Sequence, residues 1–178
     1  MSVKVYLRPI AEQDTDLIVK WRNSEYVRSH SLSKRPITRE SHMKYYRDHV
    51  LTGHYRQFIV ERADEIGVVF YPIATVYLKD VDIENQRCEL CVFTSADQEW
   101  IEDCQIEGIK LLIRKAFEEY GMHKVYTYVF CKYPEEVALL EKTGFEIEAR
   151  FMNEARELDG SYADIYRMSI VNADYNMR

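Results

Sequence analysis

The sequence predicts a single domain of the α/β (α+β) class, with a mixed central β-sheet of about seven strands flanked by about four helices. Three observations lead to this prediction. Strand-like and helix-like apolar periodicities alternate along all 178 residues. Hydrophobic residues make up 47% of the chain, which is enough for a sizeable core. No repeat, low-complexity tract or linker interrupts the pattern, so residues 1–178 are expected to form one domain.

Seven segments rich in β-branched and aromatic residues are expected to form the strands. They cover residues 3–7, 56–62, 73–78, 87–94, 124–132, 145–151 and 161–171. Residues 124–132 are apolar or aromatic on both faces, as expected of a central strand that is covered twice. The last two strands are separated by Asp159-Gly160, which is a hairpin turn signal.

Four segments with apolar residues at three- and four-residue spacing are expected to form helices. They cover residues 12–23, 39–51, 106–119 and 134–143. Thr38 is placed to cap the second helix, and Gly121 and Gly144 follow the last two, where a left-handed residue closes a helix. Residues 29–37 are polar and aperiodic, so we expect a mobile loop there, and residues 172–178 form a polar tail.

Composition excludes several classes of function. The formal net charge of −6 and the pI near 5.4 argue against a protein that binds nucleic acid through phosphate contacts. No apolar run reaches the ~18 residues of a membrane span, and the first residues lack the apolar segment of a signal peptide. We therefore expect a cytoplasmic protein with no membrane contact. A terminal strand edge offers a route to a homodimer.

Cysteine and histidine spacings do not predict a metal site. Cys88 and Cys91 lie three apart on an expected strand, so their side chains point to opposite faces and cannot bind one ion together. The five histidines include no pair at the spacing of a helical zinc site, and no cysteine or carboxylate completes a set of ligands. We expect partly packed or solvated histidines and mostly buried, reduced thiols.

The chain is organised around residues 87–119, where a buried strand leads through a short loop into a helix. The first N–H groups of a helix lack partners, and the helix dipole favours negative charge there. A helix that starts at the end of a strand is therefore a ready site for an anion.

This segment resembles the core of the GCN5-related N-acetyltransferase (GNAT) superfamily. The resemblance rests on Glu89 in the strand, on Glu141-Lys142-Thr143-Gly144-Phe145 after the last helix, and on Gly160-x-Tyr162-x-Asp164 in the last hairpin. Trp21-Arg22-Asn23 is similar to a segment of the subgroup that acetylates ribosomal-protein N-termini and nucleotide-linked amino sugars. The resemblance covers nearly the whole chain and implies a GNAT-like domain with acetyl-CoA as cosubstrate and no metal.

The family's pyrophosphate motif is degenerate in this sequence. The family has Gln/Arg-x-x-Gly-x-Gly/Ala about a dozen residues after the strand glutamate, and its backbone amides hold the pyrophosphate of coenzyme A. Counting from Glu89 without gaps places this motif at residues 100–105, Trp-Ile-Glu-Asp-Cys-Gln, which contains neither glycine. Acidic residues stand where phosphates would approach, and Asp103 is expected to cap the helix with its own carboxylate.

The resemblance also implies roles for individual residues. Glu89 would be the general base, and the alternative is a structural glutamate paired with Arg87 or a neighbouring lysine. The residues it places at the cofactor are Cys91, Val92, Phe93, Ile101, Glu102, Asp103, Cys104, Gln105 and Tyr133. The residues it places at the acceptor are Trp21, Arg22, Asn23 and Arg28, although Trp21 is also a natural core residue. Leu140 occupies the place where many members have a proton-donating tyrosine, and Glu136 the place of a small residue.

Two functions remain open from the sequence. The first is an acyl-CoA-dependent N-acetyltransferase that transfers an acetyl group to the primary amine of a small molecule, an amino sugar or a protein N-terminus. The alternative is a catalytically weak or inactive domain of the same fold that binds another ligand, a carrier-bound acyl donor or a protein partner. The acidic residues at the helix start favour the alternative, and the overall pattern favours the enzyme.

Overall fold

In the computed structural model, residues 4–95 and 102–175 are described, and their strands form one mixed sheet in the order β1-β2-β3-β4-β5-β7-β6. The strands are β1 Val5–Pro9, β2 Arg56–Ala63, β3 Phe70–Asp82, β4 Arg87–Thr94, β5 Lys124–Phe130, β6 Glu146–Arg156 and β7 Tyr162–Val171. Neighbouring strands are antiparallel except β4 and β5, which are parallel. The prediction of a mixed sheet with seven strands is confirmed.

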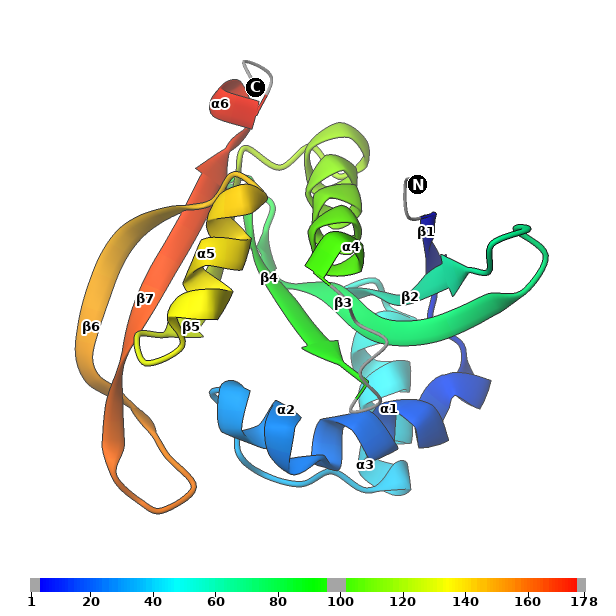
Figure 1. Cartoon of the computed structure of the whole chain (residues 1–178), viewed down its shortest axis with the longest axis horizontal. Helices are drawn as coiled ribbons and strands as arrows, with labels where there is room; N and C mark the ends of the chain where they lie inside the picture. Colours follow the sequence, from blue (N-terminus) through cyan, green and yellow to red (C-terminus); the bar gives the residue numbers. More distant parts are fainter. Residues whose placement is uncertain (1–3, 96–101, 176–178) are drawn as a thin grey trace.

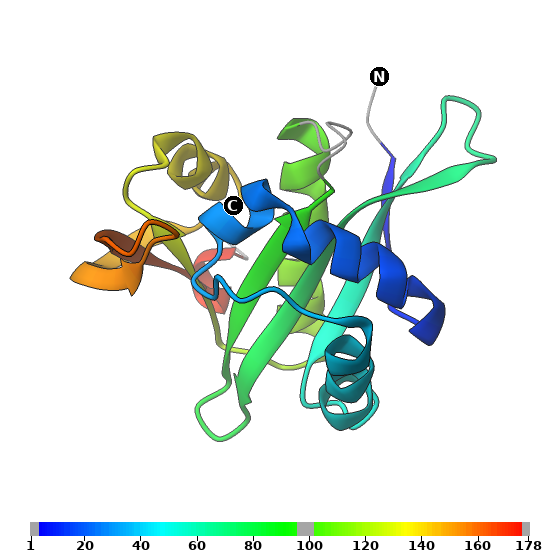
Figure 2. The ribbon, with the colours of Figure 1, turned by 90° about the horizontal axis from the view of Figure 1, so that it is seen from below.

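Helices cover both faces of the sheet, with α4 and α5 on one side and α1 to α3 on the other (Figures 1 and 2). The helices are α1 Thr15–Asn23, α2 Glu25–His30, α3 Arg39–Tyr45, α4 Glu102–Arg114, α5 Pro134–Lys142 and α6 Asn172–Tyr175. A 3-10 turn at Glu12–Asp14 precedes α1, and π-helical turns at Tyr46–Val50 and Lys115–Glu119 extend α3 and α4. Within the described residues, the four expected helices are therefore present.

Two short helices correct the sequence prediction. α2 includes part of the segment expected to be a loop, because the Ser24 side chain accepts a hydrogen bond from the Val27 N–H at 3.2 Å and so caps a new helix. α6 lies in the segment expected to be a polar tail. Asp103 is a further correction: it lies inside the first turn of α4 rather than before it, so it is not the capping residue.

The two faces of the sheet carry separate cores. The larger core joins the apolar stripe of α4 to the sheet and includes Cys104, Leu112 and Ile113, which are all fully buried. The smaller core joins α1 to the opposite face through Trp21 and Ile59. Consecutive residues of β2 enter different cores, since side chains alternate along a strand. The central strands are therefore fixed from both sides.

The feature that positions the functional site is the separation of β4 from β5. The parallel pairing is limited to three registers, from Arg87 opposite Lys124 to Glu89 opposite Tyr126. Beyond these residues β5 continues to pair with β7, whereas β4 continues to pair with β3. The two strands diverge at the centre of the sheet, so the backbone edge of each is open to a ligand.

Local predictions for glycine and cysteine also hold. Gly121 and Gly144 have φ values of +65° and +102°, which a left-handed helix end requires. Cys88 is buried in the larger core, and burial raises the pKa of its thiol to about 12. Cys91 faces the other side of the sheet, as expected from the period of a strand.

In the described part of the chain, no helix is both long enough and apolar enough to cross a membrane.

Candidate active site

A cleft of about 550 Å³ opens where β4 and β5 diverge. Its walls come from β3 and β4 on one side and from β5 and α5 on the other, and α2 with the loop after it closes one end. A volume of this size is typical of small-molecule and cofactor sites. The cleft therefore follows directly from the divergence of the two central strands.

The β4 wall carries Glu89, which is buried with a relative exposure of 6%. The antiparallel register places Lys79 of β3 directly opposite, and its Nζ lies 3.1 Å from Glu89 Oε1. The Cys91 thiol donates to the same oxygen at 3.2 Å. Burial opposes the charge of Lys79, but Cys91 and Glu89 outweigh this effect and raise its pKa. Glu89 is therefore held as one half of a buried ion pair.

The α5 wall carries two adjacent carboxyl groups, Glu135 and Glu136, in the first turn of the helix. Glu135 is exposed and Glu136 is partly buried. Burial raises the pKa of Glu136 to about 7, and the charge of Glu135 acts in the same direction. His30 Nε2 lies 3.7 Å from Glu136 Oε1. Among the described residues, neither carboxyl has an ion pair with lysine or arginine.

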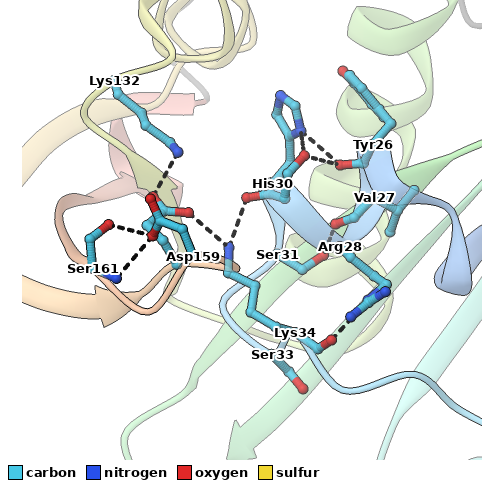
Figure 3. Close-up of polar contacts among 12 residues, drawn as sticks. Tyr26, Val27, Arg28, His30, Ser31, Ser33, Lys34, Lys132, Asp159 and Ser161 are labelled. Atoms are coloured by element: carbon cyan, nitrogen blue, oxygen red, sulfur yellow. Dashed lines mark hydrogen bonds and ion pairs between the residues drawn. The ribbon is translucent and has the colours of Figure 1, made fainter.

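An aromatic stack joins α2 to the start of α5. The ring of His30 lies flat against Tyr133, with 3.9 Å between centroids, and Tyr26 packs on it at 4.2 Å. Figure 3 shows that Tyr26 and His30 point from α2 in the same direction, away from the loop that follows the helix. Burial lowers the pKa of His30. The ring is therefore neutral at physiological pH and closes the end of the cleft between α2 and α5.

The loop after α2 is held in place by its own polar groups (Figure 3). Arg28 Nε donates to the Lys34 carbonyl at 2.9 Å, and Lys34 Nζ donates to the Ser29 carbonyl at 2.8 Å. The same Nζ lies 3.5 Å from Glu157 Oε2 at the end of β6 and 4.2 Å from the centre of the Phe130 ring. These contacts connect the loop to the β6–β7 hairpin, and we call them the Lys34–Glu157 clasp.

Arg22 is a partly buried cation on the α1 side of the cleft. Its Nη2 donates to the Ser33 carbonyl at 2.6 Å, while its Nη1 is buried with no hydrogen-bond partner among the described residues. Burial lowers the pKa of the guanidinium, and nearby Arg28 acts in the same direction. Such a group has unused capacity to donate hydrogen bonds to an anion or carbonyl.

Several residues predicted from the sequence do line the cleft. They are Arg22, Glu89, Cys91, Val92, Phe93, Glu102 and Gln105. Tyr133 reaches the cleft indirectly, through its stack on His30. The divergence of β4 and β5 thus brings together the strand segment predicted for the cofactor and one residue predicted for the acceptor.

Other predicted residues have structural roles. Trp21 is 1% exposed in the smaller core. The Asn23 amide donates to the Ile37 carbonyl and accepts from the Ile37 N–H, while Arg28 holds the loop. Cys104 is fully buried, and burial raises the pKa of its thiol. Asp103 is exposed on α4, and Ile101 lies outside the described residues. The side chains of Trp21, Asn23, Arg28, Asp103 and Cys104 therefore do not line the cleft.

The cleft residues fit the pantetheine arm of coenzyme A, because the open edges of β4 and β5 supply backbone groups along a channel of suitable volume. At the start of α4, the Glu102 carboxylate is paired with Lys142 of α5. This pair offsets the acidic charge where the sequence placed the phosphates. An acidic residue does occupy this end, as the sequence predicts, and a lysine from another helix compensates its charge.

Several polar residues that line the cleft received no site role from the sequence. Among them are Tyr77, Lys79, His30, Glu135 and Glu136. Lys79 follows from the strand register alone, because it lies directly opposite Glu89 in β3. The pair Glu135-Glu136 directly after Pro134 was a visible signal, since two acids in the first turn of a helix at the edge of a cleft favour a cationic ligand.

Together, a mixed sheet with diverging central strands and a cleft that suits an acyl-carrying thioester define an acyltransferase fold. The sequence matches the family model described as the acetyltransferase (GNAT) domain over residues 4–146, so the chain belongs to the GNAT family and is an N-acetyltransferase that uses acetyl-CoA.

Comparison with solved structures supports the fold. The chain is similar to the spermidine N-acetyltransferase from Vibrio cholerae in complex with CoA and spermine, with a TM-score of 0.88, 22% identity, and coverage of 97% of this chain and 98% of that chain. A dodecameric structure of the Vibrio enzyme has a TM-score of 0.79 with 22% identity, over 96% of this chain and 95% of that chain. Among curated proteins, no match was found.

Proposed function

We propose that this chain transfers the acetyl group of acetyl-CoA to a primary amine of a small, cationic acceptor of the polyamine type. The observation that carries this proposal is the pair of carboxyl groups at the start of α5. Glu135 and Glu136 line the cleft without an ion pair to lysine or arginine among the described residues. An acceptor that brings positive charge would supply the missing partner.

The remaining cleft residues support this assignment. Acetyl-CoA supplies the activated acetyl thioester. The edges of β4 and β5 offer hydrogen bonds to the pantetheine amides, and Lys142 offsets Glu102 at the end where phosphates bind. The aromatic stack of Tyr26, His30 and Tyr133 shields the Glu136 carboxyl from bulk water, and this strengthens its attraction for a cation. The Vibrio enzyme of similar fold has spermine in its complex.

Release of free thiol from acetyl-CoA tests the proposal against a panel of amines. The panel contains a polyamine, a monoamine of similar length, an amino sugar and a peptide with a free N-terminus. We expect the polyamine to give the highest kcat/KM. Replacing Glu135 with Gln should raise KM for the polyamine about tenfold and leave KM for the amino sugar, which has a single amine, within about twofold, because one charge contact is worth roughly 1.4 kcal/mol. A higher kcat/KM for the peptide would contradict the proposal.

Binding of acetyl-CoA separates an enzyme from an inactive domain. A ligand at 100 times its dissociation constant stabilises a protein by about 2.7 kcal/mol, which raises Tm by several degrees in a chain of this size. We expect such a shift with millimolar acetyl-CoA. An unchanged Tm would favour the alternative of an inactive domain or of a carrier-bound acyl donor.

A second candidate acceptor follows from Arg22. Its buried Nη1, which has no hydrogen-bond partner among the described residues, favours an acceptor that carries a carboxylate as well as an amine, as a free amino acid does. In that case the amino acid would exceed the polyamine in kcat/KM, and replacing Arg22 with Met would abolish the preference. The same panel, extended by one amino acid, decides between the two candidates.

A further inference from the structure

Glu136 differs from the other acidic side chains that line the cleft. Within the described part of the chain, Glu89 is paired with Lys79 and Glu102 with Lys142. Glu135 is exposed to solvent. Glu136 is only 30% exposed at its side chain, and its only ion-pair neighbour among the described residues is a histidine. Of the described carboxyls in the cleft, it is therefore the one that is both sheltered and without a fixed positive charge beside it.

The titratable groups around Glu136 come from two helices. Glu135 of α5 is a like charge, and Tyr26 of α2 is a phenol whose pKa is raised by burial and by the charge of Glu136. His30 of α2 faces it directly, and Tyr133 covers the ring of His30. None of these groups carries a positive charge at neutral pH. The surroundings therefore favour the protonated form of Glu136.

The hydrogen bonds of His30 fix which of its nitrogens faces Glu136. Its Nδ1 lies 2.8 Å from the Tyr26 carbonyl oxygen, which can only accept, so Nδ1 carries the hydrogen. In a neutral ring, Nε2 then presents a lone pair toward Glu136 Oε1, 3.7 Å away. A lone pair repels a carboxylate and attracts a carboxylic acid. His30 thus stabilises Glu136 after it has gained a proton.

We propose that Glu136, rather than Glu89, is the general base that deprotonates the acceptor amine, with neutral His30 as the positioning residue. The step is a proton transfer only: an N–H bond of the incoming ammonium breaks, an O–H bond forms at the Glu136 carboxylate, and the nitrogen keeps the electron pair. The amine is then a nucleophile. Glu89 is unsuited to this role because its charge is already committed to Lys79 and to the Cys91 thiol. This inference rests on the proposed function.

The test compares Glu136→Gln with Glu89→Gln in the full chain. In the wild type we expect log kcat/KM to fall below an inflection near pH 7, set by the raised pKa of Glu136. Glu136→Gln should lower kcat/KM by a factor of 10² or more at pH 8 and remove the inflection. Glu89→Gln should keep the inflection, whatever its rate. Glu136→Asp should restore part of the activity, since it keeps a carboxylate.

A measurement independent of turnover uses glutamate labelled with carbon-13 at the side-chain carboxyl. We expect one signal of the wild type to titrate near pH 7 and to be missing in Glu136→Gln. The proposal is overturned if Glu136→Gln keeps both the inflection and a kcat/KM within threefold of the wild type. If the wild type acetylates no amine of the panel although acetyl-CoA raises its Tm, the proposed function fails, and the role of Glu136 falls with it.

Discussion

Each wall of the cleft carries a sheltered glutamate, and the two glutamates differ in whether a neighbouring cation compensates their charge. On the β4 wall, the antiparallel register places the Lys79 ammonium 3.1 Å from Glu89. On the α5 wall, Glu136 has Glu135 as its neighbour in sequence and a neutral imidazole in front of it. The dipole at the start of α5 favours an anion by only about 0.3–1 kcal/mol. Burial is the larger effect, so Glu136 exchanges its proton near neutral pH.

The comparison teaches that burial alone does not decide the role of an acidic residue. Glu89 is the more deeply buried of the two, yet its partners make it part of the framework of the sheet. Glu136 has no comparable partner within the described residues and is free to change its protonation state. The difference comes from the elements that carry them, because paired strands fix a cation opposite by register, whereas the exposed turn of a helix does not.

The largest expected effect on stability comes from breaking the ion pair between Lys79 and Glu89. Replacing Lys79 with Met leaves the buried Glu89 charge without compensation, which should lower the free energy of unfolding by roughly 3 kcal/mol. Urea denaturation measures the change. The double variant Lys79→Met, Glu89→Gln should recover most of the loss, because no buried charge remains. A double variant as unstable as the single one would mean that the packing of the lysine stem, rather than charge, holds this wall.

The second prediction concerns the pH dependence of stability at the α5 wall. The folded-state pKa of Glu136 is raised from 4.5 to about 7. Below pH 4.5 the group is protonated in both states, and as the pH rises to about 7 the unfolded chain loses the proton first, which disfavours folding. The full shift corresponds to about 3 kcal/mol, and solvent screening of a partly exposed group reduces it to roughly 1–2 kcal/mol.

Replacing Glu136 with Gln should therefore stabilise the protein by this amount at pH 8.5 and change little at pH 4. Urea denaturation at the two pH values measures the difference. Glu89→Gln provides the matched comparison and should destabilise at pH 8.5, because it leaves Lys79 without its partner. Equal effects of Glu136→Gln at both pH values would show that the carboxyl titrates normally.

The third prediction sharpens the role of the aromatic stack. Replacing Tyr133 with Leu removes the stacked contact with His30 and should cost about 0.5–1.5 kcal/mol of stability. It also admits water to the α5 wall, so the pKa of Glu136 should fall toward its ordinary value. The carbon-13 titration measures this shift. Tyr162→Leu, at an exposed position of β7, is the control and should change neither quantity.

The smallest expected effect on stability lies at the start of α4. Glu102 and Lys142 form an exposed ion pair, and replacing Lys142 with Met should change stability by less than about 1 kcal/mol. The same change should weaken the binding of acetyl-CoA, because the charge of Glu102 would then face the phosphates. Glu102→Gln should strengthen it. Calorimetric titration at two salt concentrations tests both, and equal affinities would place the phosphates elsewhere.

Local signals predicted most of the framework. The runs of β-branched and aromatic residues in the strands, Pro134 at the first turn of α5, and the left-handed Gly121 and Gly144 each depend on a few neighbouring residues. α2 was missed because its six residues are too few to show a helical period, and its cap at Ser24 is visible only once the helix is known. The capping role predicted for Asp103 was wrong because α4 starts earlier than its apolar stripe indicates.

The site was harder to predict because its chemistry depends on contacts between distant segments. Glu89 was identified from the family resemblance, but its partner Lys79 is set by the β3–β4 register beside a bulge. The properties of Glu136 arise from α2, which lies about a hundred residues earlier in the chain. Sequence spacing therefore located the cleft through β4, whereas the charge state of its α5 wall required the folded structure.

The Lys34–Glu157 clasp has a consequence for how far the chain can be shortened and where it can be substituted. The family match ends at residue 146, yet Glu157 and the whole of β7 lie after that point. A version shortened to the matched segment would lose the strand beside β5 and, at the same time, the Glu157 contact that holds the loop after α2. Substitutions at Glu157 should therefore alter the position of the loop that closes one end of the cleft.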